Sequence, residues 1–199
     1  MLKEFLHDKF FQYKIEDRLP IRMPKKLFRR EDFSAMLGSL GLNRGVEIGT
    51  QAGVNAEQFC QTNPNIDLTC VDPWWTFDRE SKHHGEEKQN AFYDECCMRL
   101  KPYNAKILKM TSDEALSHFV DESLDFVYID GCHEFDFVMN DLIGWAKKVK
   151  RDGLISGHDY FEKKNFDVIT AVNAYTQCHK VTEWYITGNN TPSYFWAKP

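Results

Sequence analysis

The chain has 199 residues, of which 42% are hydrophobic and 14% aromatic, and its formal net charge is −5. This composition supports one packed core of ordinary size and excludes a disordered chain. The acidic balance argues against a nucleic-acid-binding protein, which usually carries a basic face. No segment is long and apolar enough to cross a bilayer, and the first residues do not have the pattern of a signal peptide.

Cysteine usage indicates the cellular setting. The six cysteines have spacings that match neither a zinc site nor a redox pair, and several stand in apolar runs, where cysteine behaves as a small hydrophobic residue. Free thiols of this kind persist in a reducing compartment, so we expect a cytoplasmic protein.

Residues 1–30 mix aromatic and charged side chains. We expect a short helix and then an irregular segment that is either a strap packed on the domain or a lid over it. This segment contains a basic patch, which comprises Lys25, Lys26, Arg29 and Arg30. We interpret the patch as a solvated face, and the alternative is a surface for an acidic ligand or partner.

From residue 31 onward, strand-like and helix-like segments alternate. Strands are expected at 45–49, 67–72, 105–109, 124–130 and 154–156. Helices are expected at 31–40, 53–60, 86–100, from 112, at 135–149 and at 166–178. Strands separated by helices of this length predict a parallel, doubly wound α/β sheet.

The C-terminal end departs from this alternation. Two β-rich runs, 180–187 and 193–197, are joined only by residues 188–192. Because a parallel crossover needs a dozen or more residues, these two runs must form an antiparallel hairpin.

A glycine-containing turn, Glu47-Ile-Gly49-Thr50-Gln-Ala-Gly53, follows the first strand of the alternating region. Gly49 permits a tight turn, and Gly53 allows a helix or a ligand to approach closely. The middle glycine of the dinucleotide fingerprint is missing, which disfavours a dinucleotide oxidoreductase. Glu47 places under the turn a carboxylate that repels phosphates and attracts an ammonium or sulfonium group. S-adenosylmethionine carries both of these cations.

Further candidate cofactor contacts follow the next two strands. Asp72 ends the strand at 67–72, where a carboxylate can bind both ribose hydroxyls. Trp74 and Trp75 come next and either stack on the ligand or belong to the core. Ser112 and Asp113 follow the strand at 105–109 and could bind the adenine edge. The combination predicts a nucleoside ligand without a pyrophosphate.

Acid and imidazole groups follow two later strands. Asp130 ends the strand at 124–130, with His133 three residues on, and His158 and Asp159 follow the strand at 154–156. An open α/β sheet builds its site at such carboxyl ends of strands. These residue types can move a proton or hold a divalent cation, so the chain is expected to be an enzyme.

With these motifs the chain resembles the class I S-adenosylmethionine-dependent methyltransferases. It is similar to the family 24-like branch, which is related to sugar and natural-product O-methyltransferases. The resemblance runs from about Arg44 to the C-terminus. Its motifs are Val46-Glu-Ile-Gly-Thr50, Val71-Asp-Pro-Trp74, Tyr128-Ile-Asp-Gly-Cys-His133 and Asp152-Gly-Leu-Ile-Ser-Gly-His-Asp-Tyr160.

The resemblance implies a Rossmann-like sheet of seven strands, mostly parallel with an antiparallel C-terminal hairpin strand. It also implies an S-adenosylmethionine-binding domain over residues 31–199. Residues 1–30 fall outside the resemblance, and we expect them to influence the choice of substrate.

The resemblance further implies roles at the two acidic clusters. Asp130 and Asp159 would bind a divalent metal, Mg²⁺ or Mn²⁺, with His158 beside them, and His133 would be the general base. Asp130 would also lie against the cofactor. Relatives often have two acids where this chain has His158 and Asp159. Metal assistance therefore stays one alternative beside proton removal by a base alone. Purely structural roles for His133 and His158 are also possible.

The expected function is methyl transfer by in-line displacement to a small-molecule acceptor, most simply a hydroxyl of a sugar or natural product. The alternatives are transfer to nitrogen or to a protein side chain, and a non-catalytic protein that only binds S-adenosylmethionine. We expect no nucleic-acid or membrane partner, and homo-oligomerisation is possible.

Overall fold

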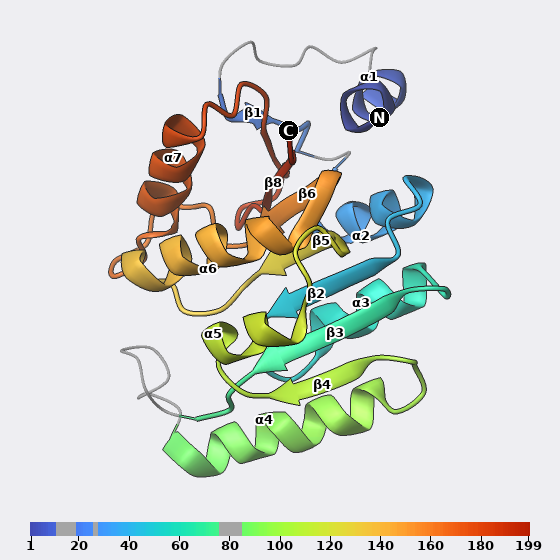
Figure 1. The fold of residues 1–199 in the computed structure, drawn as a ribbon, viewed down its shortest axis with the longest axis vertical. Helices are drawn as coiled ribbons and strands as arrows, with labels where there is room; N and C mark the ends of the chain where they lie inside the picture. Colours follow the sequence, from blue (N-terminus) through green and yellow to red (C-terminus); the bar gives the residue numbers. More distant parts are fainter. Residues whose placement is uncertain (11–18, 26–27, 76–84) are drawn as a thin grey trace.

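One eight-stranded sheet organises the residues that this computed structural model describes, 1–10, 19–25, 28–75 and 85–199. The strand order is β1-β7-β8-β6-β5-β2-β3-β4 (Figure 1). The strands are β1 (Ile21–Arg22), β2 (Arg44–Ile48), β3 (Asp67–Asp72), β4 (Lys106–Lys109), β5 (Leu124–Ile129), β6 (Val149–Gly157), β7 (Tyr185–Ile186) and β8 (Tyr194–Ala197). β8 is antiparallel to both of its neighbours, and the other pairs are parallel. The Rossmann-like fold class is confirmed.

Helices cover both faces of the sheet (Figure 1). They are α1 (Leu2–Phe10), α2 (Arg30–Ser39), α3 (Val54–Thr62), α4 (Gly85–Leu100), α5 (Ser112–Ala115), α6 (Phe135–Lys148) and α7 (Val168–Cys178). Buried side chains of α1 to α4 pack in one hydrophobic cluster, and those of α5 to α7 pack in another. The sheet therefore separates two cores, as a doubly wound fold requires.

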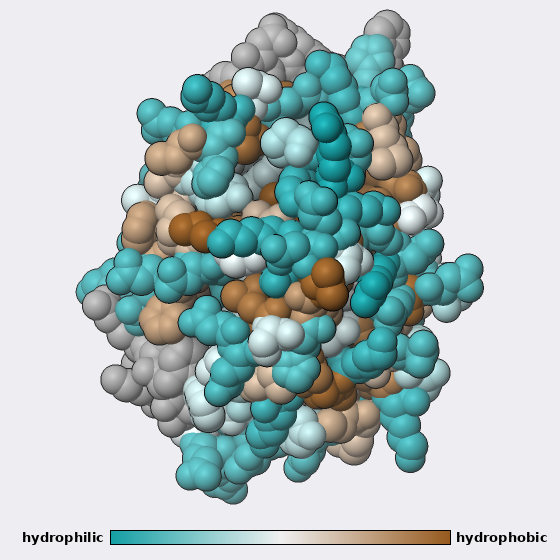
Figure 2. Space-filling view, viewed as in Figure 1, coloured by the Kyte–Doolittle hydropathy of each residue, from teal (hydrophilic) through white to brown (hydrophobic). Residues whose placement is uncertain are grey.

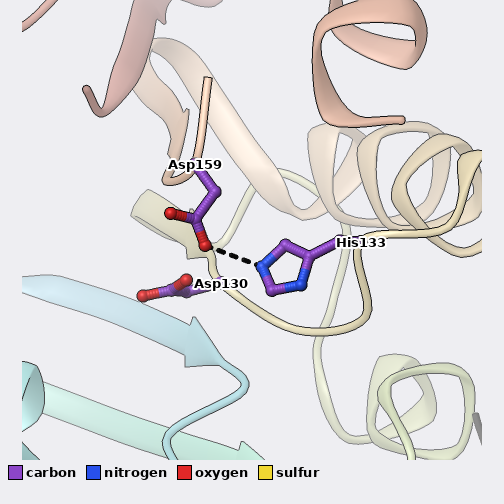
Figure 3. A group of neighbouring side chains, drawn as sticks. All are labelled: Asp130, His133 and Asp159. Atoms are coloured by element: carbon purple, nitrogen blue, oxygen red, sulfur yellow. Dashed lines mark ion pairs between the residues drawn. The ribbon is translucent and has the colours of Figure 1, made fainter. Parts of the chain in front are cut away.

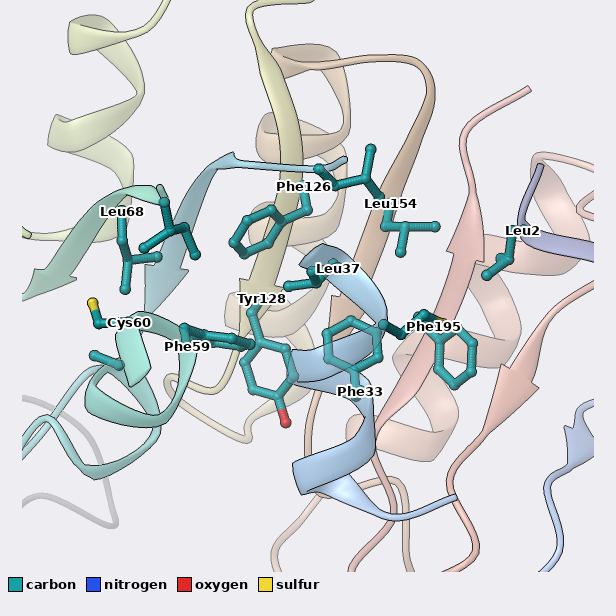
Figure 4. Close-up of a cluster of buried hydrophobic side chains, with 14 of the residues drawn as sticks. Leu2, Phe33, Leu37, Phe59, Cys60, Leu68, Phe126, Tyr128, Leu154 and Phe195 are labelled. Carbon is teal, nitrogen blue, oxygen red and sulfur yellow. The ribbon is translucent and has the colours of Figure 1, made fainter. Parts of the chain in front are cut away.

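The central strands alternate their side chains between these two cores. Phe126 and Tyr128 of β5 belong to the cluster with α2 and α3, whereas Val127 and Ile129 belong to the cluster with α6 (Figure 4). All four side chains are buried, because β5 lies in the middle of the sheet and both of its faces are covered. This burial fixes the register of the strand whose end carries Asp130.

The C-terminal hairpin has the predicted antiparallel pairing, with Tyr185 opposite Phe195 and Ile186 opposite Tyr194. Its first strand, β7, comprises only Tyr185–Ile186, whereas the β-rich run at 180–187 predicted a longer strand. The sheet also has one strand more than the seven implied by the family resemblance. This strand, β1, pairs in parallel with β7. Two residues are too few to produce an alternating pattern in a sequence, so β1 was not expected.

The described parts of the N-terminal segment pack against the domain. Leu2, Leu6 and Phe10 form the buried face of α1 at helical spacing. The ring of Phe10 lies 5.6 Å from that of Phe28, which lies 5.6 Å from Phe195 of β8. The expected helix is therefore present, while residues 11–18 and 26–27 of the expected strap lie outside the described residues. The domain division at residue 30 and a role as a lid stay predictions.

The surface in the view of Figure 2 is mostly hydrophilic, with hydrophobic residues scattered among polar ones. Within the described ranges, we find no helix with the length and apolar character needed to span a membrane. All six cysteines are free thiols.

Phe33 tests the attachment of α2 to the sheet. Its ring is fully buried, 5.7 Å from the ring of Tyr128 and 5.3 Å from that of Phe195. We expect Phe33→Ala to lower the free energy of unfolding by about 3–5 kcal/mol, because it leaves a cavity between helix and sheet. Urea unfolding would measure this, with the exposed Met98→Ala as a control that changes little. A Phe33→Ala protein as stable as the control would contradict this packing.

Candidate active site

The site lies where four parallel strands end in register. Ile48 of β2 pairs with Val71 of β3 and with Ile129 of β5, and Ile129 pairs with Gly157 of β6. The residues that follow these four positions therefore reach the same edge of the sheet, and they are Gly49, Asp72, Asp130 and His158. From β2 the chain continues to β3 on one side of β2, and β5 lies on the other side of β2. Ligands of open α/β sheets bind at this kind of switch point.

A cavity of about 540 Å³ opens at this edge. This volume is within the range of ordinary small-molecule sites. The expected site residues that line it are Gly49, Asp72, Ser112, Asp113, Asp130, His133, His158 and Asp159. The remaining expected cofactor residues, Glu47, Thr50, Gly53 and Trp74, do not belong to the lining. One cavity thus joins the glycine turn to the acid and imidazole clusters.

Gly49 allows the end of β2 to lie against the end of β5. Its φ is +83°, and a Cβ at this position would lie 2.1 Å from the carbonyl oxygen of Asp130. Both facts require glycine here, because the conformation disfavours other residues and the neighbouring backbone leaves no room. Gly53 also has a positive φ, +76°, and an added Cβ there would meet the Sγ of Cys96 at 3.1 Å. The first glycine shapes the cavity, and the second allows α4 to pack beneath the turn.

Asp72 ties together the loops that follow β2 and β3. Its Oδ2 accepts a hydrogen bond from the backbone N–H of Gln51 at 2.9 Å, and its Oδ1 accepts one from that of Trp74 at 2.8 Å. The Trp74 side chain turns inward and is buried, and its indole N–H donates to the carbonyl of Gln51 at 2.9 Å. Trp75, with 48% of its surface exposed, lines the cavity instead. Trp74 therefore belongs to the core, which was one of the two roles expected for the tryptophans. Trp75 is the tryptophan positioned to cover a ligand.

Ser112 connects the cavity wall to α6. Its hydroxyl accepts a hydrogen bond from Trp145 Nε1 at 2.7 Å and donates a short one to Asp141. Burial raises the pKa of the Asp141 carboxyl to about 7. Because Ser112 is engaged with these partners, Asp113 beside it is the better placed of the two expected residues to bind a ligand through its side chain.

Glu47 lies beneath the glycine turn, almost completely buried. Its Oε1 accepts a hydrogen bond from Asn55 Nδ2 at 2.6 Å, whereas Oε2 has no hydrogen-bond partner among the described residues. Burial raises the pKa of this carboxyl to about 7, and the neighbouring charge of Asp130 adds to the shift. A buried carboxyl of this kind favours a cation above it, which agrees with the charge argument made from the sequence.

His133, which follows β5, contacts Asp159, which follows β6 (Figure 3). Nε2 of His133 lies 2.8 Å from Oδ2 of Asp159, and the imidazole ring stacks on Phe166 with 4.0 Å between ring centroids. His158 Nδ1 lies 3.0 Å from the other oxygen of Asp159 and 3.6 Å from Oδ1 of Asp130. The stack and the carboxylate contact together orient the His133 ring at the cavity wall.

These contacts set the charges of the cluster. Burial alone would raise the pKa of Asp159, but the contacts with His133 and His158 outweigh it and hold that pKa well below the usual range. Burial alone would lower the pKa of His158, but its contacts with Asp130 and Asp159 raise it to about 9. Asp159 is therefore ionised and His158 protonated at neutral pH.

Arg30 is a site residue that the sequence did not indicate. Its Nη2 donates to Oδ2 of Asp130 at 2.6 Å, its Nε donates to Asn55 Oδ1 at 3.0 Å, and its guanidinium lies 5.5 Å from the ring centre of Tyr128. The solvated-face interpretation of the basic patch is therefore wrong for Arg30, whose side chain is only 26% exposed. Arg29 of the same patch is exposed. The acidic partner of Arg30 lies 100 positions further along the chain, where no local pattern could reveal it.

The fit of a divalent metal can be judged from these contacts. Ligand atoms of Asp130, His133 and Asp159 lie within 4.8 Å of one another, and His158 is not part of that group. Two carboxylates and one imidazole are a usable donor set for Mn²⁺ or a similar ion. However, Arg30 engages Asp130, and both histidines engage Asp159. An ion would have to displace these partners, so the arrangement does not fit a resident metal.

Comparison with known proteins agrees with this architecture. A family model described as a methyltransferase domain matches residues 46–160. An uncharacterised protein of Sinorhizobium fredii, y4gI, is 28% identical, and the match spans 62% of this chain but only 14% of that protein.

Two of the solved structures that share the fold show the extent of the likeness. One, of Staphylococcus aureus, is assigned as a caffeoyl-CoA O-methyltransferase, with a TM-score of 0.60, 15% identity, and coverage of 100% of this chain and 90% of that one. The other is an O-methyltransferase of Bacillus cereus in complex with S-adenosylhomocysteine, with a TM-score of 0.60, 10% identity, and coverage of 83% and 78%. At these identities the likeness is one of fold.

The strand order and the strand-end site belong to the Rossmann-like fold that these two solved methyltransferase structures share. Since the family model covers more than half of the chain, this protein belongs to that methyltransferase domain family. The resemblance stated from the sequence is therefore confirmed for the fold and the family.

Glu47 predicts a pH dependence of stability. Its pKa rises from 4.5 to about 7 on folding, so the folded state keeps a proton that the unfolded state releases between these values. Stability due to this group therefore falls as the pH rises from about 4.5 to 7, by on the order of 3 kcal/mol. Glu47→Gln should remove this decline, measured by urea unfolding at pH 5 and pH 8. The control is Glu86→Gln, at an exposed position, and equal pH slopes for Glu47→Gln and wild type would contradict the shift.

Proposed function

We propose that this protein transfers the methyl group of S-adenosylmethionine to a hydroxyl of a small molecule, such as a sugar or natural product. The observation that carries this proposal is the 2.8 Å contact of Asp159 with His133 in the same cavity as Asp72 and the glycine turn. A held imidazole is the group needed to remove the proton of an alcohol.

The cofactor would lie along the ends of β2 and β3. Asp72 would bind the ribose hydroxyls, Asp113 the adenine edge, and the backbone at Gly49 would approach the ligand closely. The buried Glu47 carboxyl beneath the turn would favour the positive charges of the amino acid part. The cofactor complex of the Bacillus cereus O-methyltransferase supports this choice of ligand.

The proposed methyl transfer needs no reagent other than S-adenosylmethionine and the acceptor. The acceptor hydroxyl gives its proton to His133, and its oxygen forms a bond to the methyl carbon. The carbon–sulfur bond breaks, and its electron pair stays on sulfur, which becomes a neutral thioether. Asp159 stabilises the imidazolium that forms on His133, and alignment of oxygen, carbon and sulfur supplies much of the acceleration.

Three alternatives use the same cavity. An amine acceptor would need less help with its proton, so the His133 and Asp159 pair favours a hydroxyl. Metal assistance, with a divalent ion on Asp130 and Asp159 beside His133 or His158, could also lower the acceptor pKa, but it would require the ion to displace Arg30 from Asp130. A non-catalytic binding protein would not require this oriented imidazole. Self-association stays a prediction.

Asp72→Ala should weaken S-adenosylhomocysteine binding by about 1–3 kcal/mol, because a charged hydrogen bond to the ribose is lost. Calorimetric titration measures this affinity. The affinity of Asp72→Asn should lie between those of wild type and Asp72→Ala, because one acceptor oxygen remains. The melting temperature of each variant controls for loosening of the two loops that Asp72 joins. Unchanged affinity in a folded Asp72→Ala protein would refute the ribose assignment.

His133→Ala should retain S-adenosylhomocysteine affinity and lose methyl transfer by a factor of about 10²–10⁴, the usual contribution of a general base. Turnover is measured as S-adenosylhomocysteine release with an acceptor found by screening hydroxylated sugars and natural products. Loss of cofactor binding together with turnover would show that His133 is structural.

A further inference from the structure

We propose that Arg30 is the resident cation of this site and takes the place of a divalent metal on Asp130, so that methyl transfer proceeds without a metal ion. This inference rests on the proposed function of the cavity. It starts from the 2.6 Å contact between Arg30 Nη2 and Asp130 Oδ2, which ties the end of β5 to the first residue of α2.

The guanidinium and a divalent ion would compete for the same carboxylate. An Mg²⁺–oxygen bond is about 2.0–2.1 Å long, so an ion on Oδ2 of Asp130 would lie very close to the Arg30 nitrogen. The two cations would repel each other strongly in a site that water screens poorly. Arg30 cannot relieve this by losing its proton, because a guanidinium stays charged in proteins.

Arg30 is held in place from several elements. Asn55 of α3 accepts a hydrogen bond from its Nε and in turn donates to the buried Glu47 of β2. The ring of Tyr128 lies against the guanidinium from β5. Moving Arg30 away from Asp130 would break this set of contacts, so the pair is a built part of the site rather than a chance surface contact.

The second carboxylate is also engaged within the chain. Asp159 contacts His133 at 2.8 Å and His158 at 3.0 Å. A metal bound by Asp130, His133 and Asp159 would therefore have to break the ion pairs of both acids. In the present arrangement, each candidate ligand already has a partner from the protein.

The same cation can assist the reaction. Arg30 lines the same cavity as His133, so its fixed positive charge acts within the space in which the acceptor oxygen develops negative charge. A guanidinium stabilises such charge but does not generate an alkoxide as a metal can. This division of roles leaves proton removal to His133.

Manganese binding tests the proposal directly. Electron paramagnetic resonance would follow Mn²⁺ titrated into the 199-residue protein saturated with S-adenosylhomocysteine. We expect wild type to leave the ion free and Arg30→Met to bind one ion at least about tenfold more tightly, a gain of about 1.4 kcal/mol. The matched control is Arg29→Met, whose side chain is 59% exposed and which should behave like wild type.

Two further variants test whether the charge of Arg30 and the carboxylate of Asp130 control Mn²⁺ binding. Arg30→Lys retains the charge and should still exclude Mn²⁺, and adding Asp130→Asn to Arg30→Met should abolish the gained binding. Methyl transfer by wild type should be unchanged by a chelator. Tight Mn²⁺ binding by wild type that Asp130→Asn removes would overturn the proposal, as would a folded Arg30→Met protein that gains no binding. Failure of the proposed function would be seen separately, as absent S-adenosylhomocysteine binding.

Discussion

The pairing of β2 with β3 on one side and β5 on the other is the constraint on which the site depends. Ile48 has a register partner in each neighbour, and both partners are buried. A slip of one residue in either pair would turn buried side chains toward the opposite core, so hydrophobic burial along the strands fixes the register. This packing therefore aligns the polar residues that follow the strand ends.

In the wall of the cavity and beneath it, polar side chains form a continuous series of contacts from the glycine turn to the proposed base. In order, these residues are Glu47, Asn55, Arg30, Asp130, His158, Asp159 and His133. Buried charges are tolerated when they are paired, and each acid here faces an amide, a guanidinium or an imidazole. A change at one end of the series would therefore alter the electrostatics at the other end.

The sequence predicted the features that depend on short segments. Apolar runs ending in Asp72 or Asp130 identified the strands and the site edge, because strand, turn and functional residue are adjacent in the chain. Trp74 and Trp75 could not be distinguished, since their directions depend on the backbone of the loop, where Trp74 has φ of +47°. The two-residue β1 was equally unpredictable, because its pairing with β7 decides it, and Arg30 meets Asp130 only through the packing of α2 on the sheet.

The position of Arg30 has a consequence for protein engineering. Arg30 lies before residue 46, where the family match begins. A hybrid enzyme that combined the strand-end motifs of this chain with the leading segment of a relative would keep every recognisable motif and lose the guanidinium on Asp130. Its unbalanced carboxylate could then recruit an ion from the buffer, so exchanging a segment without catalytic motifs could change the cation requirement of the hybrid.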